Sequence, residues 1–209
     1  LLLAIVPAAC FTWFALQIPE VAAGSAIFES WPWVPVLDVA LGLRLDGLAL
    51  LFALLITGIG SLIVMYSGAY LHDHPQLGRF YAYLLVFMMA MLGLVLADDL
   101  IAMFVFWELT SIASYLLISF NHEKPASRRA ALQALLITGG GGLALLAGLV
   151  LLGIAADTWQ FSQLQAELVQ AHALFPAIMV LVLIGCFTKS AQFPFHLWLP
   201  NAMNAPTPV

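Results

Sequence analysis

The sequence predicts an all-α membrane protein: a polytopic bundle of about six transmembrane helices, with a broken helix near Pro194 and a short external extended or hairpin segment. Two observations predict this class. The chain is 64% hydrophobic and only 8% charged, with a mean hydropathy of +1.05, whereas soluble domains carry roughly a quarter charged residues. Its apolar residues also form runs of about 20, the length that crosses a bilayer.

These apolar runs divide the chain into five parts. We expect a transmembrane helix at 1–18, an external extended loop at 19–46, a four-helix transmembrane core at 47–153, an interfacial segment at 154–172 and a broken transmembrane helix at 173–209. Within the core, the helices are predicted at 47–69, 80–97, 100–120 and 130–153. The turns between them are short and polar, as expected for antiparallel neighbours in a bundle.

The two longer connections carry their own signals. Residues 19–46 hold three prolines and the alternating stretch LGLRLD, which favours extended or hairpin structure at the surface. Residues 154–172 contain TWQFSQLQAELVQAH, a pattern that indicates a short amphipathic helix lying at the membrane interface.

The last apolar segment is too long for one straight span. LFPAIMVLVLIGCFTKSAQFPFHLWLPNAM covers residues 174–203, about 45 Å as a continuous helix, whereas the hydrocarbon core is about 30 Å thick. Pro194 would also remove a backbone hydrogen bond from the helix interior. We therefore predict a break near 190–194, with Lys189 beside it.

The basic residues predict the orientation, since cytoplasmic loops carry an excess of Lys and Arg. The loops at 71–79 and 121–129 share one side of a six-helix arrangement, and the loops at 19–46, 97–99 and 154–172 share the other. The first side holds Arg79, Lys124, Arg128 and Arg129, and the second holds only Arg44. The loops at 71–79 and 121–129 are therefore expected in the cytoplasm.

Glu108 lies near the middle of the apolar segment 100–120. A carboxylate at such a position is costly, and ionisable residues inside membrane helices usually mark proton or ion pathways. Glu108 could also pair with a neighbour as a purely structural contact, or stay protonated and inert. Ser111, Tyr115 and Ser119 fall on the same helical stripe as Glu108, a run of hydroxyl groups that could hold a file of water.

Lys189 and His196 are the other candidate proton-transfer residues. Lys189 could snorkel to an interface, but FPFHLWLP continues the apolar character beyond it. A desolvated lysine gains and loses a proton at working pH, and histidine does so without perturbation. A lone histidine is more often structural, and His196 becomes a relay candidate because it follows the predicted break.

Other classes of chemistry have no motif in this sequence. Cys10 and Cys186 lie far apart in apolar segments, which suits buried thiols better than a disulfide or a metal site. Neither a metal site nor a cofactor is expected, and the scattered basic residues exclude a nucleic-acid patch. TGGGG at 138–142 lies within a predicted helix, where small residues allow helix backbones to pack closely.

Three stretches carry a family resemblance: ADDLIAMFVFWELTSIASYLLISF at 97–120, FTKSAQFPFHLWLPNAMNAPTPV at 187–209 and LRLDGLALLFALLITGIGSLIVMYS at 43–67. They resemble the antiporter-like proton-pumping subunits shared by respiratory complex I and the Mrp cation/proton antiporters. FWELTSIASYLLISFNHEK, followed by ALLITGGGGLALLAG, is most similar to the large A-type subunit of the Mrp complex. The uncharged stretch 134–150 argues against the complex I branch, whose subunits typically carry an Arg and an Asp there.

The resemblance implies specific roles. The family uses a glutamate on its fifth helix and a lysine at the break of its seventh, which correspond to Glu108 and Lys189, and His196 matches a further titratable position of the Mrp branch. Segment 1–18 would be the family's second helix, so the chain is expected to be part of a longer polypeptide.

Three functions remain open. The resemblance implies a secondary transporter subunit rather than an enzyme: a proton-translocating subunit of a multisubunit Na⁺/H⁺ antiporter, in the cell inner membrane with other membrane subunits and lipid as partners, moving protons and monovalent cations. The second is the equivalent subunit of a redox-driven proton pump, complex I or a membrane-bound hydrogenase. The third is a non-conducting membrane scaffold.

Overall fold

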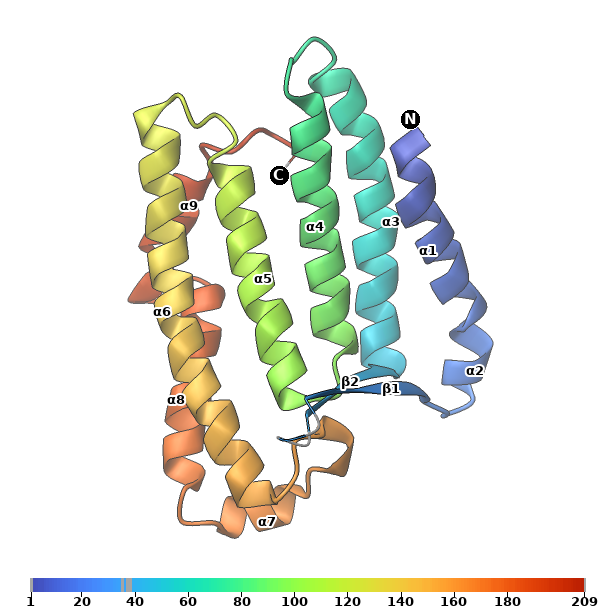
Figure 1. Cartoon of the computed structure of the whole chain (residues 1–209), viewed down its shortest axis with the longest axis vertical. Helices are drawn as coiled ribbons and strands as arrows, with labels where there is room; N and C mark the ends of the chain where they lie inside the picture. Colours follow the sequence, from blue (N-terminus) through green and yellow to red (C-terminus); the bar gives the residue numbers. More distant parts are fainter. Residues whose placement is uncertain (1, 35, 37–38, 209) are drawn as a thin grey trace.

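The computed structural model describes residues 2–34, 36 and 39–208, and Figure 1 shows their arrangement. Long helices stand side by side in chain order, and a small two-stranded sheet lies across one end of the row. The principal elements are α1 (Ile5–Leu16), α2 (Ile18–Ala22), β1 (Ile27–Val34), β2 (Val39–Leu45), α3 (Gly47–Tyr70), α4 (Leu77–Leu96), α5 (Leu100–Ile118), α6 (Pro125–Ala156), α7 (Ala166–Ala171), α8 (Phe175–Lys189) and α9 (Trp198–Ala202). This arrangement confirms the predicted helical membrane bundle.

Five helical stretches of the described residues are long and apolar enough to cross a membrane. They are Leu2–Ala22, Gly47–Tyr70, Leu77–Leu96, Leu100–Ile118 and Pro125–Ala156. The sixth expected span, α8, is apolar but has only 15 residues. At 1.5 Å per residue it covers about 22 Å, less than the hydrocarbon core of about 30 Å. α8 therefore ends part of the way along the bundle.

Local sequence signals fix where three of the long helices begin. The Asp46 carboxylate accepts the backbone N–H groups of the first turn of α3, and the Asp99 carboxylate does the same for α5, at 2.8–3.1 Å. Both are standard N-caps. α6 begins at Pro125, which needs no N–H donor there, and ends before Asp157 at φ 54°. At 32 residues, α6 extends beyond the predicted 130–153 at both ends.

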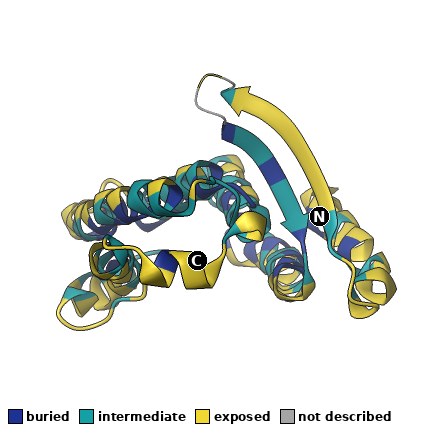
Figure 2. Ribbon diagram, turned by 90° about the horizontal axis from the view of Figure 1, so that it is seen from below, coloured by how far each residue is buried: buried dark blue, intermediate teal, exposed yellow. Residues whose placement is uncertain are grey.

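The predicted extended segment is an antiparallel hairpin, preceded by the short helix α2 that the sequence did not indicate. β2 packs against the ends of α3, α4 and α5, whereas β1 is largely exposed (Figure 2). The cross-strand pair Phe28–Arg44 places the guanidinium group 5.5 Å from the centroid of the phenyl ring, within the range of a cation–π contact.

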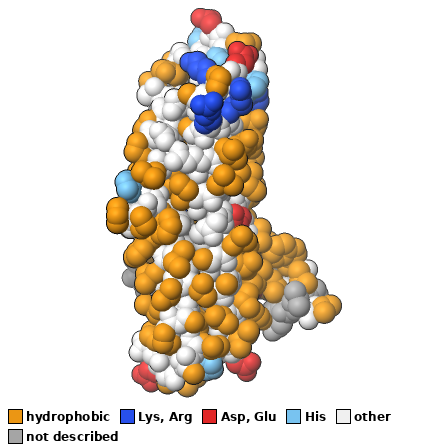
Figure 3. Space-filling view, turned by 90° about the vertical axis from the view of Figure 1, so that its left-hand side faces the viewer, with side chains coloured by type: hydrophobic (Ala, Val, Ile, Leu, Met, Phe, Trp, Pro, Cys, Tyr) orange, Lys and Arg blue, Asp and Glu red, His pale blue; other side chains and the backbone are white. Residues whose placement is uncertain are grey.

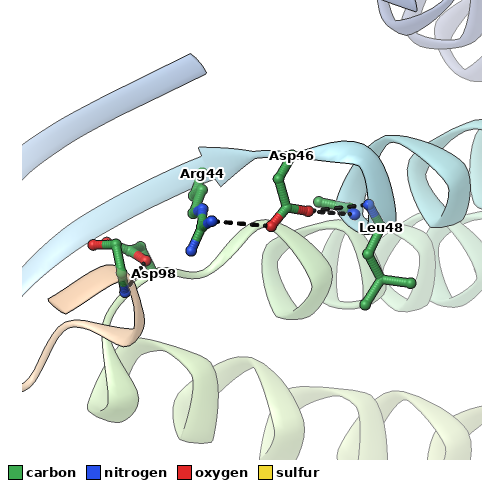
Figure 4. Close-up of polar contacts among 6 residues, drawn as sticks. Arg44, Asp46, Leu48 and Asp98 are labelled. Carbon is green, nitrogen blue, oxygen red and sulfur yellow. Dashed lines mark hydrogen bonds and ion pairs between the residues drawn. The ribbon is translucent and has the colours of Figure 1, made fainter. Parts of the chain in front are cut away.

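A network of hydrogen bonds ties this end of the bundle together, and we call it the hairpin-end seam. The buried Asp98 carboxylate accepts the backbone N–H of Ser162 at 2.9 Å and its hydroxyl at 2.6 Å. The Asp98 N–H donates to Gly42 O at 2.9 Å. The seam therefore joins β2, the α4–α5 turn and the segment after α6. Figure 4 shows Asp98 near the Arg44–Asp46 ion pair, in which nitrogen and oxygen are 3.4 Å apart.

Basic side chains gather at the opposite end of the bundle (Figure 3). Arg79, at the start of α4, donates to Phe120 O at 2.8 Å and so connects the α3–α4 and α5–α6 turns. Lys124 and Arg128 flank the start of α6 in the same region. The structure thus separates the loops into the two groups on which the predicted orientation rests.

This separation gives a prediction that cysteine labelling tests. Ala126 and Ala23 are exposed and belong to opposite loop groups. In a background without Cys10 and Cys186, a membrane-impermeant maleimide should label Ala23→Cys in intact cells and Ala126→Cys only after permeabilisation. The opposite pattern would reverse the orientation.

Candidate functional site

The site begins with the position of Glu108 on α5. This helix packs between α4 and α6, and its Asp99 cap fixes where the helix starts. Glu108 lies near its midpoint and is half-buried. A buried ionisable group that is not satisfied is costly, so the neighbours of this carboxyl group decide what it can do.

Glycines of α6 make room for the carboxyl group of Glu108. A Cβ atom built on Gly142 would lie 1.8 Å from Oε1, and one on Gly139 would lie 3.9 Å from Oε2. Only a residue without a side chain at position 142 leaves this space open. The Oε1 atom is buried and has no hydrogen-bond partner in the described part of the chain. Oε1 can therefore still accept a hydrogen bond or bind a proton.

Lys189, the last residue of α8, reaches across to α5. Its Nζ atom donates to Thr110 Oγ1 and Ser111 Oγ, each at 2.7 Å, and lies 3.3 Å from Trp107 O. It also lies 5.4 Å from the centroid of the Trp107 ring. An ammonium group has three donors, and α5 supplies an acceptor for each. Lys189 thus points into the bundle.

Glu108 and Lys189 do not form a direct ion pair. Within residues 2–34, 36 and 39–208, the pairs of a basic side-chain nitrogen and a carboxylate oxygen closer than 4.0 Å are Arg44–Asp46 and His72–Asp73. The Lys189 nitrogen and the Glu108 carboxyl oxygens are therefore more than 4.0 Å apart. Both groups are instead connected to α5. Glu108 is a residue of this helix, and the hydroxyls that bond Lys189 lie two and three positions after it.

Close packing of α6 and α8 brings Lys189 to this position. A Cβ on Gly141 would lie 1.7 Å from Thr188 Oγ1, and one on Gly185 would lie 2.6 Å from Leu145 Cβ. The glycine run at 139–142 therefore allows close helix contact, as predicted. It also has a use that the sequence did not reveal, since Gly142 faces Glu108.

α8 ends at the predicted break, with Lys189 beside it. Ser190 N–H donates to Cys186 O and Gln192 N–H to Phe187 O, each at 2.9 Å. Ala191 has φ 52°, a left-handed conformation that ends a helix. The chain thus leaves the helix before it reaches Pro194.

The other candidate residues lie apart from the Lys189 contact. Tyr115 packs against an alanine-rich cluster on α6, and the Ser119 hydroxyl donates to Leu116 O at 3.3 Å near the end of α5. His196 is exposed, and its ring stacks on Phe193 with centroids 5.7 Å apart. Of the predicted water-path residues, only Ser111 bonds Lys189.

Trp107 and Thr110 are contacts that the sequence reasoning did not assign. Positions 107, 110 and 111 are related by i, i+3 and i+4 spacing, which places them on one helical face. That spacing is the signal that could have identified them as a docking site for another helix.

No group of three or more potential metal ligands occurs in the described residues.

Fold and site together define a class: polytopic helical membrane proteins with an acidic and a basic side chain inside the bundle. The chain belongs to the NADH:quinone oxidoreductase/Mrp antiporter transmembrane family, whose model matches residues 97–209. A second family model, described as the N-terminus of complex I chain 5, matches residues 31–81.

Individual relatives agree with this membership. The chain is 50% identical over 206 residues to the A1 subunit of the Na(+)/H(+) antiporter of Staphylococcus haemolyticus and 49% identical to that of a Staphylococcus aureus strain. Each alignment covers 98% of this chain and 26% of the relative. The chain thus spans about a quarter of the length of these relatives.

Solved structures show the same fold. A chain of the Mrp complex from Dietzia sp. DQ12-45-1b matches with a TM-score of 0.87 and 39% identity, covering 98% of this chain and 23% of that one. A chain of an archaeal membrane-bound sulfane sulfur reductase matches with a TM-score of 0.83 and 22% identity, covering 99% and 42%.

Proposed function

We propose that this chain is part of a proton-translocating subunit of a multisubunit monovalent cation (Na⁺)/proton antiporter, in which protons pass through Glu108 and Lys189. The relatives named as Na⁺/H⁺ antiporter subunits support the transporter class. One observation carries the residue assignment: the Lys189 amino group is bonded to hydroxyls two and three positions after Glu108 on α5. The complex would lie in the cytoplasmic membrane with its other membrane subunits.

The proposed mechanism depends on charge coupling between the two groups. A protonated Lys189 stabilises an ionised Glu108 at short range, because the surroundings screen charges less than water does. When the amine loses its proton, that stabilisation disappears and the carboxylate takes a proton. The two groups then titrate as one unit. The free Oε1 lone pair of Glu108 is where the incoming proton would bind.

The hydroxyl groups on α5 give the amine a fixed position in both charge states. A hydroxyl can accept from an ammonium group or donate to a neutral amine, so Thr110 and Ser111 bond Lys189 before and after proton loss.

Tyr115 and Ser119 would line a water path along α5, and His196 would receive or supply protons at the exposed side of the break.

The test separates a titrating lysine from one that only supplies charge. Arginine remains protonated under physiological conditions, so Lys189→Arg keeps the positive charge but cannot release its proton. Cation-dependent proton flux in inverted vesicles that hold the whole complex should fall about a hundredfold, the typical contribution of a positioned proton donor. Wild-type flux in Lys189→Arg, at normal subunit levels, would contradict the relay.

Lys124→Arg is the matched control. Lys124 is an exposed lysine in the turn before α6, far along the sequence from the break. Its replacement should leave the flux unchanged, because its charge remains and no proton transfer is assigned to it.

A further inference from the structure

The carbonyl groups at the end of α8 need donors from elsewhere. The last four carbonyls of any helix lack intrahelical partners, and inside a bilayer an unsatisfied backbone group costs several kcal/mol. Three of these carbonyls have donors in the structure. Cys186 O and Phe187 O accept backbone N–H groups of the turn that follows, whereas Thr188 O accepts a side chain from beyond the break.

That side chain is Trp198, the first residue of α9. Its indole Nε1–H donates to Thr188 O at 3.0 Å. The ring is half-buried and packs on a cluster formed by Ile118 of α5 and three alanines of α6, Ala130, Ala131 and Ala134. The donor therefore packs against α5, which carries Glu108, and α6, which faces it.

Thr188 is held on its other side as well. Its hydroxyl donates to Gly185 O at 2.8 Å, and its side chain fills the space above Gly141 of α6. Packing against α6 and the bond from Trp198 thus fix the residue directly before Lys189. The three bonds made by Lys189 Nζ depend on where its Cα lies, because a shift of the helix end moves the whole side chain.

We propose that Trp198 is a positioning residue for proton transfer: its indole N–H fixes the carbonyl at the end of α8 and so keeps the Lys189 amine on the hydroxyls of α5. This inference rests on the proposed function of Lys189. It assigns Trp198 no proton of its own. A displacement of about 1 Å at a reacting group can cost about a hundredfold in rate, so loss of this one bond should be visible in transport.

The sharpest variant changes one atom. Replacing Trp198 by 3-benzothienylalanine through codon suppression puts sulfur in place of the N–H and keeps the size and packing of the ring. Trp198→Phe is the second variant. Each should lower cation-dependent proton flux about tenfold to a hundredfold at wild-type subunit levels. Each should also speed hydrogen exchange of the Ser190 and Gln192 amides, which close the same helix end.

Suppression with natural tryptophan at position 198 is the matched control, and Trp13→Phe controls for loss of an exposed indole on α1. In a Lys189→Arg background the benzothienyl substitution should lower the residual flux no further, because coupled residues are not additive. Unchanged exchange, or faster exchange with wild-type flux, would overturn the positioning role. Wild-type flux in Lys189→Arg alone would instead refute the proposed relay, whatever position 198 shows.

Discussion

Glu108→Gln is expected to lower cation-dependent proton flux by about a hundredfold or more while the complex still assembles. Glutamine has nearly the size of glutamate and fits the space beside Gly142, so the packing of α5 on α6 remains. Its amide cannot take up and release a proton at working pH. The measurement is proton flux in inverted vesicles that contain the whole complex, with subunit levels determined by immunoblot.

Two further variants complete this experiment. Glu108→Asp keeps an ionisable group on a shorter side chain and should retain part of the flux with an altered pH profile. Glu167→Gln, at an exposed position of α7, should behave like the wild type. If the subunit is a non-conducting scaffold, Glu108→Gln should have the opposite result. The flux should be normal and the complex equally or more stable, because removing a buried charge often stabilises a protein.

Three successive glycines of α6 should respond to alanine in three different ways. At Gly142 the new methyl group would lie 1.8 Å from Glu108 Oε1. Because the carboxyl group ends a flexible side chain, it can move away at little cost in stability. It then leaves its position beside α6, so Gly142→Ala should lower the flux about a hundredfold with normal assembly.

At Gly141 the same methyl group would lie 1.7 Å from Thr188 Oγ1 and 2.5 Å from Thr188 Cβ. A branched side chain at a helix contact cannot move aside, so α8 must shift. Overpacking of this kind costs about 1–3 kcal/mol. Gly141→Ala should therefore lower the thermal midpoint of the detergent-solubilised complex as well as its flux.

Gly140→Ala is the internal control, because nothing lies within 4 Å of a Cβ atom there. Alanine favours a helix by about 1 kcal/mol over glycine, so this variant should be neutral or slightly stabilising. Equal flux losses at all three positions would show that helix flexibility, rather than space for Glu108 and Thr188, is what the glycines provide.

The charged residues of the site could be found from the sequence because the membrane makes them conspicuous. Glu108 interrupts an apolar run, and Lys189 precedes a proline in a segment too long for one span. The structure places both side chains inside the bundle and ends α8 at Lys189. Inspection of single segments was sufficient for these two residues, because an ionisable side chain stands out in an apolar run before any partner helix is known.

The partners of these residues could not be found in the same way. Thr110 and Gly142 matter because of which helix faces them, and hydropathy does not contain that information. The start of α6 was missed for a related reason: Ser127, Arg128 and Arg129 in its first turns are polar, so an apolar window begins later than the helix. α2 was missed because prolines and glycine nearby favoured an extended chain.

The hairpin-end seam bears on how the chain is made. Asp98 and Ser162 are 64 residues apart, so a ribosome adding about 5–20 residues per second delivers the serine roughly 3 to 13 s after the aspartate. Throughout that interval the carboxylate lacks the serine donors that it has in the finished fold, and it must stay where water can reach it. The seam can close only after α5 and α6 have both been inserted and the chain has returned to the side from which α5 started. The Asp98–Ser162 bonds therefore form only once both helices are in place.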